Sequence, residues 1–137
     1  MRILITDGSK RVRETLIRYL DLEQNFEMVF EASTVKEAIR IMQNIKIEVV
    51  LLDIQLHDQS GLELVNFCNT QSHKPVVIVC SNYGMPNYIN VYEKLSIDHF
   101  FDKSSEMLDL KKFIKKLIKD VKNNLTSSST NVSSYHL

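Results

Sequence analysis

A short, strongly apolar run that ends in a single carboxylate limits what this chain can fold into. Residues 47–53 read IEVVLLD, and the polar segment IQLHDQSG follows them. So brief an apolar run is typical of a strand covered on both faces, as in a parallel sheet with helices on each side. An ionised Asp in that setting is costly unless it lies where the strand ends and meets water, a metal or a cation. We therefore take Asp53 as the candidate reactive centre.

The rest of the chain alternates strand-like and helix-like segments around this run. Strands are expected at residues 2–7, 26–32, 47–53, 76–81 and 97–102. Helical patterns are expected from 10 to about 23, from 34 onward, from 60 to about 69, through Tyr88, Tyr92 and Leu95, and from Ser104 or Ser105 through Val121. Five strand–helix pairs in strict alternation predict an α/β fold with a doubly wound parallel sheet and right-handed crossovers.

Hydroxyl residues mark where three of the helices should begin. Ser9 is a plausible N-cap, and Thr34 and Ser60 each precede a Glu by three residues, which is the capping-box pattern. In the first helix, Val12, Leu16, Tyr19 and Leu20 recur at helical spacing and are expected to face the core.

Length and composition indicate one cytoplasmic domain. The chain has 137 residues, of which 44% are hydrophobic, enough for one core. No apolar run approaches the length of a membrane span, and the opening MRILITDG does not resemble a signal peptide. Cys68 and Cys80 are too few for a disulfide framework and form no CxxC metal pattern, so reduced thiols are expected, with Cys80 buried in a strand.

The charges balance overall but are segregated along the chain. Seventeen basic and seventeen acidic residues argue against non-specific nucleic-acid binding. Residues 21–65 carry nine acidic and three basic residues, whereas residues 108–122 carry six Lys and two Asp. A contact between two copies of the chain, that is a homodimer, is therefore worth testing. Residues 1–122 are expected to form the folded domain and the polar residues 123–137 a disordered tail.

Four of the expected strands end in polar groups of complementary kinds. These are Asp7, Asp53, Ser81 and Lys103. In a doubly wound sheet the carboxyl ends of the strands converge on one edge, where ligands and chemistry sit. Two carboxylates, a hydroxyl and an ammonium suit an aspartyl phosphate, because phosphoryl transfer to an Asp needs positioning and neutralisation of the phosphoryl oxygens. Lys103 would supply part of that neutralisation and Mg²⁺ the rest.

On these motifs, residues 1 to about 122 resemble a response-regulator receiver domain. The resemblance implies a flavodoxin-like (βα)5 fold with strand order 2-1-3-4-5. It implies that Asp53 in VVLLDIQL is the phosphoacceptor, that Ser81 in VIVCSNYG moves toward the phosphoryl group, and that Lys103 in HFFDKS binds the phosphate. Taken singly, each residue also has an ordinary role, as a strand end, a turn cap or a solvated loop residue.

The resemblance also assigns a metal site and a switch. Asp7, Asp53 and the backbone carbonyl of Gln55 fall where the family holds Mg²⁺, and Phe100 falls at the family's switching aromatic. Two positions depart from the family pattern. Gly8 replaces the second acid after the first strand, which should weaken Mg²⁺ binding, and His57 replaces a Pro four residues after Asp53.

The leading interpretation is a stand-alone response regulator of a two-component phosphorelay. A sensor histidine kinase or phosphotransfer protein would phosphorylate Asp53, and the output would be a protein partner, without direct contact to nucleic acid and without membrane insertion. As a receiver it would be no enzyme beyond catalysing its own phosphotransfer and autodephosphorylation.

The same residues allow three other interpretations. Gly8 favours a phosphorylation-independent pseudo-receiver that acts as a protein-binding module, which a Mg²⁺ titration would distinguish. A flavin carrier on the same fold would need a hydroxyl- and Gly-rich loop after the first strand, and DGSKR is a poor match. A phosphatase that uses Asp53 would need an acid two residues later, where Gln55 stands.

Overall fold

Five parallel strands form a single sheet in the order β2-β1-β3-β4-β5, which confirms the expected strand order. The computed structural model describes residues 1–82 and 97–126. Its strands are β1 (Arg2–Thr6), β2 (Met28–Ala32), β3 (Val49–Leu52), β4 (Val76–Ser81) and β5 (His99–Asp102). Its helices are α1 (Lys10–Tyr19), α2 (Leu22–Asn25), α3 (Val35–Asn44), α4 (Gly61–Asn69) and α6 (Met107–Thr126). The helix expected through Tyr88, Tyr92 and Leu95 lies outside the described residues.

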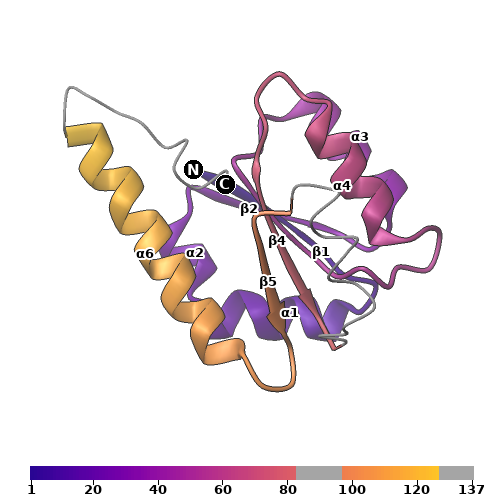
Figure 1. Cartoon of the computed structure of the whole chain (residues 1–137), viewed down its shortest axis with the longest axis horizontal. Coiled ribbons are helices and arrows are strands. Elements are labelled where there is room, and N and C mark those ends of the chain that lie inside the picture. The colour runs from indigo at the N-terminus through magenta and orange to yellow at the C-terminus, as the bar shows by residue number, and fades with distance from the viewer. Residues whose placement is uncertain (83–96, 127–137) are drawn as a thin grey trace.

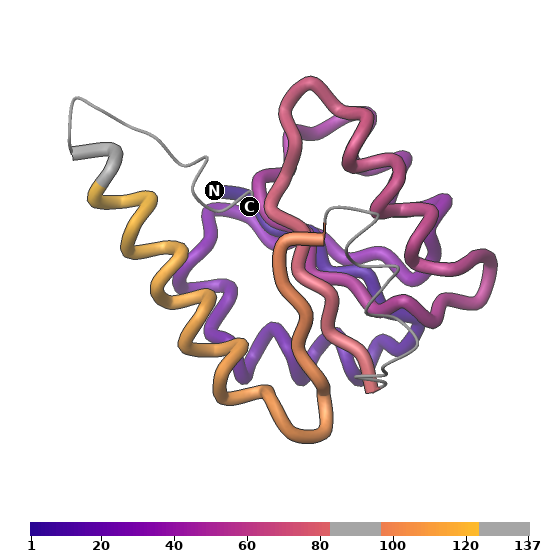
Figure 2. The backbone as a smooth tube through the Cα atoms, in the orientation of Figure 1, coloured from indigo at the N-terminus to yellow at the C-terminus, as the bar shows by residue number. Residues whose placement is uncertain are grey.

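Helices cover both faces of the sheet, which explains why the central strands are mostly apolar. Helices α1, α2 and α6 lie on one face, and α3 and α4 on the other (Figures 1 and 2). Every residue of β3 and of β4 is buried. Alternate strand residues therefore feed two cores, with Ile3, Ile5 and Leu51 on the α6 side and Leu4 and Leu52 on the α3 side.

The three expected helix caps are confirmed by hydrogen bonds. Ser9 Oγ accepts from the Val12 N–H at 3.2 Å, and Thr34 Oγ1 accepts from the Glu37 N–H at 3.1 Å. Ser60 Oγ accepts from the Leu62 N–H at 3.3 Å. Each hydroxyl satisfies one of the backbone donors that a helix start leaves without an intrahelical partner.

The first helix ends earlier than its hydrophobic pattern predicted. Instead of one helix to about residue 23, α1 ends at Tyr19, and α2 begins after Asp21, which adopts a left-handed conformation with φ of 53°. That break lets both Leu20 and Leu22 enter the core. The prediction that Tyr19 faces the core is wrong: its side chain is 37% exposed, and the Lys111 ammonium lies 4.8 Å from its ring centroid.

The last helix begins later and ends later than expected. It starts at Met107, and the Glu106 carbonyl accepts its first backbone hydrogen bond, from the Leu110 N–H. Ser104 and Ser105 are therefore not its caps, because the Asp102 carboxylate holds the Ser104 N–H in the turn after β5 at 2.7 Å. The helix continues to Thr126, past the expected boundary at Lys122. The division into a domain and a disordered tail stays a prediction, because residues 127–137 lie outside the described residues.

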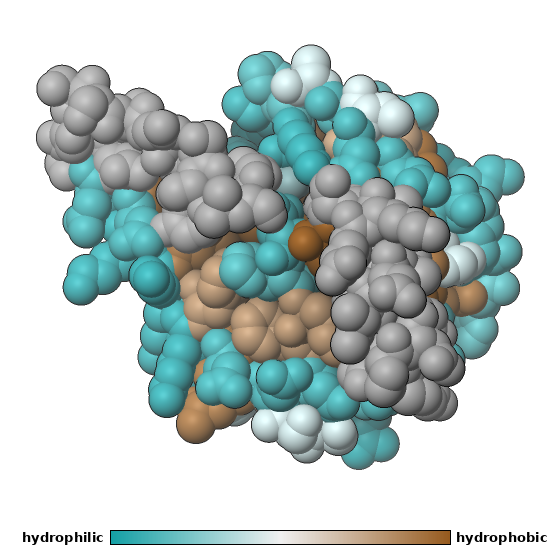
Figure 3. Space-filling model, in the orientation of Figure 1, coloured by the Kyte–Doolittle hydropathy of each residue, from teal (hydrophilic) through white to brown (hydrophobic). Residues whose placement is uncertain are grey.

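The apolar stripe of α6 packs against the sheet. Leu110, Ile114, Leu117 and Ile118 are buried. Hydrophobic surface fills the space between α6 and the β5 edge of the sheet (Figure 3). Phe113 reaches from α6 to β5, with its ring centroid 5.8 Å from that of Phe101. Among the described residues, no helix is both long and apolar enough to cross a membrane.

Candidate functional site

Asp7 and Asp53 lie side by side because the strands before them are paired. Thr6, the last residue of β1, pairs with Leu52, the last residue of β3. The ladder continues one residue further, since the Asp53 N–H donates to the Thr6 carbonyl at 2.9 Å. The register of the two central strands therefore brings two carboxylates, far apart in the sequence, to one point on the edge of the sheet.

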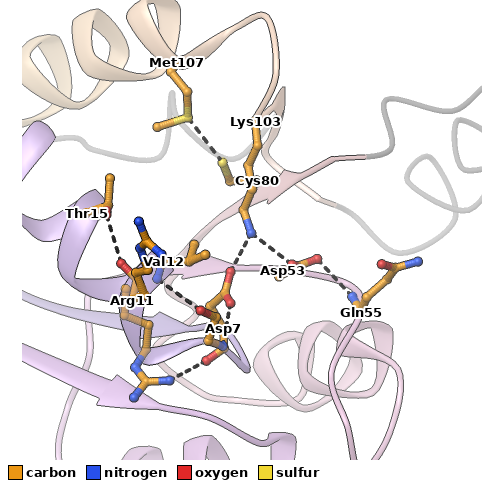
Figure 4. A network of polar contacts seen from close by, with 11 residues as sticks. Asp7, Arg11, Val12, Thr15, Asp53, Gln55, Cys80, Lys103 and Met107 are labelled. Atoms are coloured by element: carbon orange, nitrogen blue, oxygen red, sulfur yellow. Dashed lines mark hydrogen bonds and ion pairs between the residues drawn. The ribbon is translucent and has the colours of Figure 1, made fainter.

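Lys103 bridges the two carboxylates (Figure 4). Its Nζ lies 2.5 Å from Asp7 Oδ2 and 2.9 Å from Asp53 Oδ2. The three side chains are largely shielded from water, with exposed fractions of 12%, 7% and 13% for Lys103, Asp7 and Asp53. Burial opposes the charged ammonium, but the hydrogen bonds to Asp7 and Asp53 outweigh it and raise the pKa of Lys103 above its usual 10.5.

Backbone N–H groups hold the remaining carboxylate oxygens. The Ser9 N–H donates to Asp7 Oδ1 at 2.9 Å, and the Gln55 N–H donates to Asp53 Oδ1 at 3.0 Å. Each carboxylate therefore has one oxygen on the ammonium and the other on the loop that follows it. Such fixed donors set the direction in which each carboxylate points. The structure thus ties Gln55 to the site through its N–H, and the metal role of its carbonyl stays a prediction.

A backbone hydrogen bond to Lys103 connects Ser81 to the site. It ends β4, pairs with Asp102, and accepts the Lys103 N–H on its carbonyl at 2.8 Å. Ser81 is only 2% exposed. Phe100 pairs with Val79 in the same pair of strands and packs against the core on the α3 side. The structure therefore links Ser81 and Phe100 to Lys103 through two adjacent strands, while their roles as a hydroxyl switch and a switching aromatic stay predictions.

Arg13 is a structural member of the site that sequence reasoning did not single out. Its Nη1 donates to the Asp7 carbonyl at 2.7 Å, and its Nε donates to Glu31 Oε1 at 2.9 Å. The guanidinium thereby ties α1 and β2 to the start of the β1–α1 loop. The only sequence signal was its place among three arginines spaced between the apolar positions of the first helix.

The loop after Asp53 is fastened to a different helix by Asp58. Asp58 Oδ1 accepts from the Val35 N–H at 3.0 Å, and Oδ2 accepts from the Lys36 N–H at 3.1 Å, both in the first turn of α3. Desolvation raises the pKa of Asp58 somewhat, but these backbone donors outweigh it and hold the pKa below its usual 3.8. The carboxylate also meets the positive end of the helix dipole.

That fastened loop places the His57 ring directly over Gly8. A Cβ atom built on Gly8 would lie 2.9 Å from His57 Cδ2 and 3.0 Å from His57 Nε2. Distances this short are closer than van der Waals contact, so a side chain at position 8 and the present place of the imidazole exclude each other. Nothing in the spacing of His57 in the sequence indicates this contact.

Comparison with known proteins places the chain in a family. The model of the response regulator receiver domain matches residues 3–115. The chain belongs to this family. A receiver of the CheY-like type from Methanospirillum hungatei superimposes with a TM-score of 0.75 at 23% identity, over 89% of this chain and 96% of that one. The five-stranded sheet and its flanking helices are thus those of a receiver domain.

Two relatives with similar sequences are longer than this chain. An uncharacterized response regulatory protein of Yersinia pestis is 34% identical over 134 residues, which are 91% of this chain and 52% of that protein. The sensory transduction protein LytT of Bacillus anthracis is 26% identical over 84% of this chain and 48% of its own length. The chain therefore spans about half the length of these relatives.

The carboxylate side chains of this receiver do not by themselves complete the magnesium site that its family implies. The response regulator TrrA of Thermotoga maritima, 26% identical over 84% of this chain with a TM-score of 0.71, was solved with Mg²⁺ and BeF. Here Gly8 contributes no carboxylate, and Lys103 already engages both Asp7 and Asp53. Within residues 1–82 and 97–126, no three His, Cys, Asp or Glu side chains gather closely enough to hold a metal. Mg²⁺ prefers near-octahedral oxygen coordination, which this donor set does not offer.

Proposed function

We propose that this receiver accepts a phosphoryl group on Asp53 and passes the change on through protein–protein contacts. The observation that carries the proposal is the Lys103 ammonium 2.9 Å from Asp53 Oδ2, at the carboxyl end of a buried strand. A fixed ammonium beside a carboxylate nucleophile supports phosphoryl transfer, because the transferring oxygens carry negative charge that must be neutralised. A sensor histidine kinase or a phosphotransfer protein is the donor that the receiver family implies.

In the proposed reaction an Asp53 oxygen attacks the phosphorus of a phosphohistidine. The new O–P bond forms as the N–P bond breaks, and the departing imidazole nitrogen keeps the electron pair and takes up a proton. Lys103 then bonds to the phosphoryl oxygens, which releases its present bonds to the two carboxylates. The Lys103 N–H donates a hydrogen bond to the Ser81 carbonyl at 2.8 Å, which supports coupling of that rearrangement to β4. There the Ser81 hydroxyl would turn toward the phosphoryl group.

Intact-mass spectrometry tests this proposal. The protein is incubated with acetyl phosphate, or with a purified histidine kinase and ATP, in a buffer that contains Mg²⁺. One acid-labile phosphoryl adduct is expected on the wild type and none on Asp53→Asn. Asp109→Asn, on an exposed position in the first turn of α6, is the matched control and should still be phosphorylated. An unmodified wild type under both donors would remove the phosphoacceptor proposal.

The second candidate is a protein-binding module that works without phosphate. It is favoured by Gly8 in place of an acid, and by the engagement of both carboxylates with Lys103. Under this alternative, the affinity for a protein partner is the same for the wild type and Asp53→Asn. Under the leading proposal, the two differ once the phosphodonor is added.

Further parts of the proposal depend on the whole protein. Stand-alone action, cytoplasmic location, the absence of direct nucleic-acid contact and a homodimer all stay predictions, since the chain spans about half the length of its relatives. One solved neighbour is a LuxR-family DNA-binding response regulator of Staphylococcus aureus, and its 20% identity to this chain supports the fold alone. Sedimentation of the purified chain, with and without phosphodonor, tests the homodimer.

A further inference from the structure

The space above Gly8 is where this receiver differs most from the pattern of its family. A second acid would begin there, next to Asp7, but the His57 ring fills the first atom position of any such side chain. The Ser33 carbonyl closes the same space at 3.9 Å from the built Cβ. The missing acid and the histidine are therefore one structural feature rather than two separate departures.

The backbone at Gly8 does not itself require glycine. No glycine within the described residues has a positive φ, so Gly8 occupies a conformation that other residues adopt without strain. What stands in the way of a side chain at position 8 is the His57 imidazole.

The loop that carries His57 is held at three places. The Gly61 N–H donates to the Ile54 carbonyl at 2.6 Å, and Gln55 and Ser60 form a bridge across the loop. Asp58, the residue after His57, is bound to the first turn of α3 by two hydrogen bonds. These contacts fix the backbone of the loop, so the imidazole leaves Gly8 only by changing its own rotamer.

We propose that Gly8 and His57 act as a pair: Gly8 supplies no acid, and the His57 ring occupies the place where an acid at position 8 would begin, so that the site holds a divalent cation tightly only when both residues are changed. Asp58 is a positioning residue in this arrangement, since it holds the loop that carries the ring. Lys103 is then the cation that the two carboxylates retain. The inference rests on the proposed function only in taking Asp7 and Asp53 as the acids of the site.

A double-mutant cycle with metal binding as its readout tests the pair. Mn²⁺ binding is measured by electron paramagnetic resonance, with Mg²⁺ as competitor, for the wild type, Gly8→Asp, His57→Ala and the double variant. The double variant is expected to bind Mn²⁺ at least about fivefold more tightly than Gly8→Asp, whereas His57→Ala alone should change the wild-type affinity less than about twofold. His73→Ala combined with Gly8→Asp is the control, because His73 is also exposed but lies in the loop before β4. It should bind as Gly8→Asp does.

Several results would decide the matter. The proposed pairing of Gly8 with His57 would be overturned if the Gly8→Asp variant bound Mn²⁺ as tightly as the double variant. It would also be overturned if the wild type bound Mn²⁺ as tightly as the double variant. A double variant that is folded by circular dichroism but binds no more tightly than the wild type would also overturn it. If Gly8→Asp folds only together with His57→Ala, the steric exclusion is supported directly. No phosphodonor is present, so a failed phosphorylation assay leaves this test intact, and a failed cycle leaves the proposed function intact.

Discussion

The Lys103 ammonium and the Asp53 carboxylate, fifty residues apart in the sequence, meet at 2.9 Å, and both side chains are largely shielded from water. The contact follows from the sheet, because β3 and β5 flank β4 and their carboxyl ends lie on the same edge. Asp7 shares the same ammonium from β1. One ammonium therefore offsets part of the negative charge of two carboxylates that would otherwise repel each other at close range.

Removal of that cation should destabilise the fold. Lys103→Met is expected to lower the free energy of unfolding by roughly 1–3 kcal/mol, less than for a fully buried pair, because Asp7 and Asp53 lose their shared partner. Urea denaturation at neutral pH measures the change. Lys112→Met, on the exposed face of α6, is the control and should stay within about 0.5 kcal/mol of the wild type. Equal stability of the two variants would contradict the role given to Lys103.

The same residue should give the stability an alkaline limit. The pKa of Lys103 is raised in the folded protein above its usual 10.5, so the unfolded chain loses this proton first as the pH increases. Its contribution is therefore fully present below pH 10.5 and is lost as the pH rises through the higher folded value. The difference in unfolding free energy between wild type and Lys103→Met should shrink only in that alkaline range. A difference that shrinks between roughly pH 6 and 9 would contradict this assignment.

Arg13 should stabilise the β1–α1 loop more than its neighbours on α1 do. Arg13→Met removes the hydrogen bond to the Asp7 carbonyl and the ion pair with Glu31, and should cost roughly 1–2 kcal/mol of unfolding free energy. Arg11→Met, on an exposed position of the same helix, should cost less than about 0.5 kcal/mol. Thermal denaturation of the two variants side by side makes the comparison. Equal melting temperatures for Arg13→Met and Arg11→Met would contradict this prediction.

Asp58 should stabilise the start of α3 from a distant loop. Asp58→Ala is expected to cost roughly 0.5–1 kcal/mol, the lower part of the range for N-caps because the carboxylate is exposed and screened by salt. Faster hydrogen exchange at the Val35 and Lys36 amides is its local signature, and Gln59→Ala is the control. Because the folded pKa lies below the usual 3.8, the contribution is present above pH 3.8 and is lost as the pH falls through the lower folded value. Unchanged exchange at those two amides would refute the cap.

The two thiols should be inert in the native protein. Cys68 and Cys80 are free and buried, and burial raises the pKa of each thiol to about 12. A thiol-specific chromophoric reagent at roughly neutral pH should therefore label neither residue until denaturant is added, and both afterwards. Rapid labelling of Cys80 in the native state would show that the core beneath the site opens more readily than its packing indicates.

The sequence was sufficient to predict the strand order and the meeting of Asp7, Asp53 and Lys103. The strand order came from the resemblance to receiver domains. The meeting of the three side chains follows from the rule that strand ends converge in a doubly wound sheet. The N-caps at Ser9, Thr34 and Ser60 were also predictable, because capping depends on nearest neighbours in the chain.

Other features depend on backbone geometry that no local pattern encodes. The left-handed conformation of Asp21 ends α1 early, although the apolar residues continue at helical spacing. Asp58 caps a helix that begins 23 residues before it. His57 contacts Gly8 only because the loop that carries His57 and Asp58 passes over the β1–α1 turn. Side chains on irregular loops have no period, so their partners become visible only once the loops are placed.

The identity of the phosphorylated residue is the most direct test of the whole account. After treatment with acetyl phosphate or kinase, borohydride converts an aspartyl phosphate to homoserine, and tandem mass spectrometry of the peptides locates the converted residue. We expect homoserine at position 53 and at no other aspartate. Conversion at a different residue, or no conversion in a protein that has stayed folded, would contradict the claim that Asp53, beside Lys103, receives the phosphoryl group.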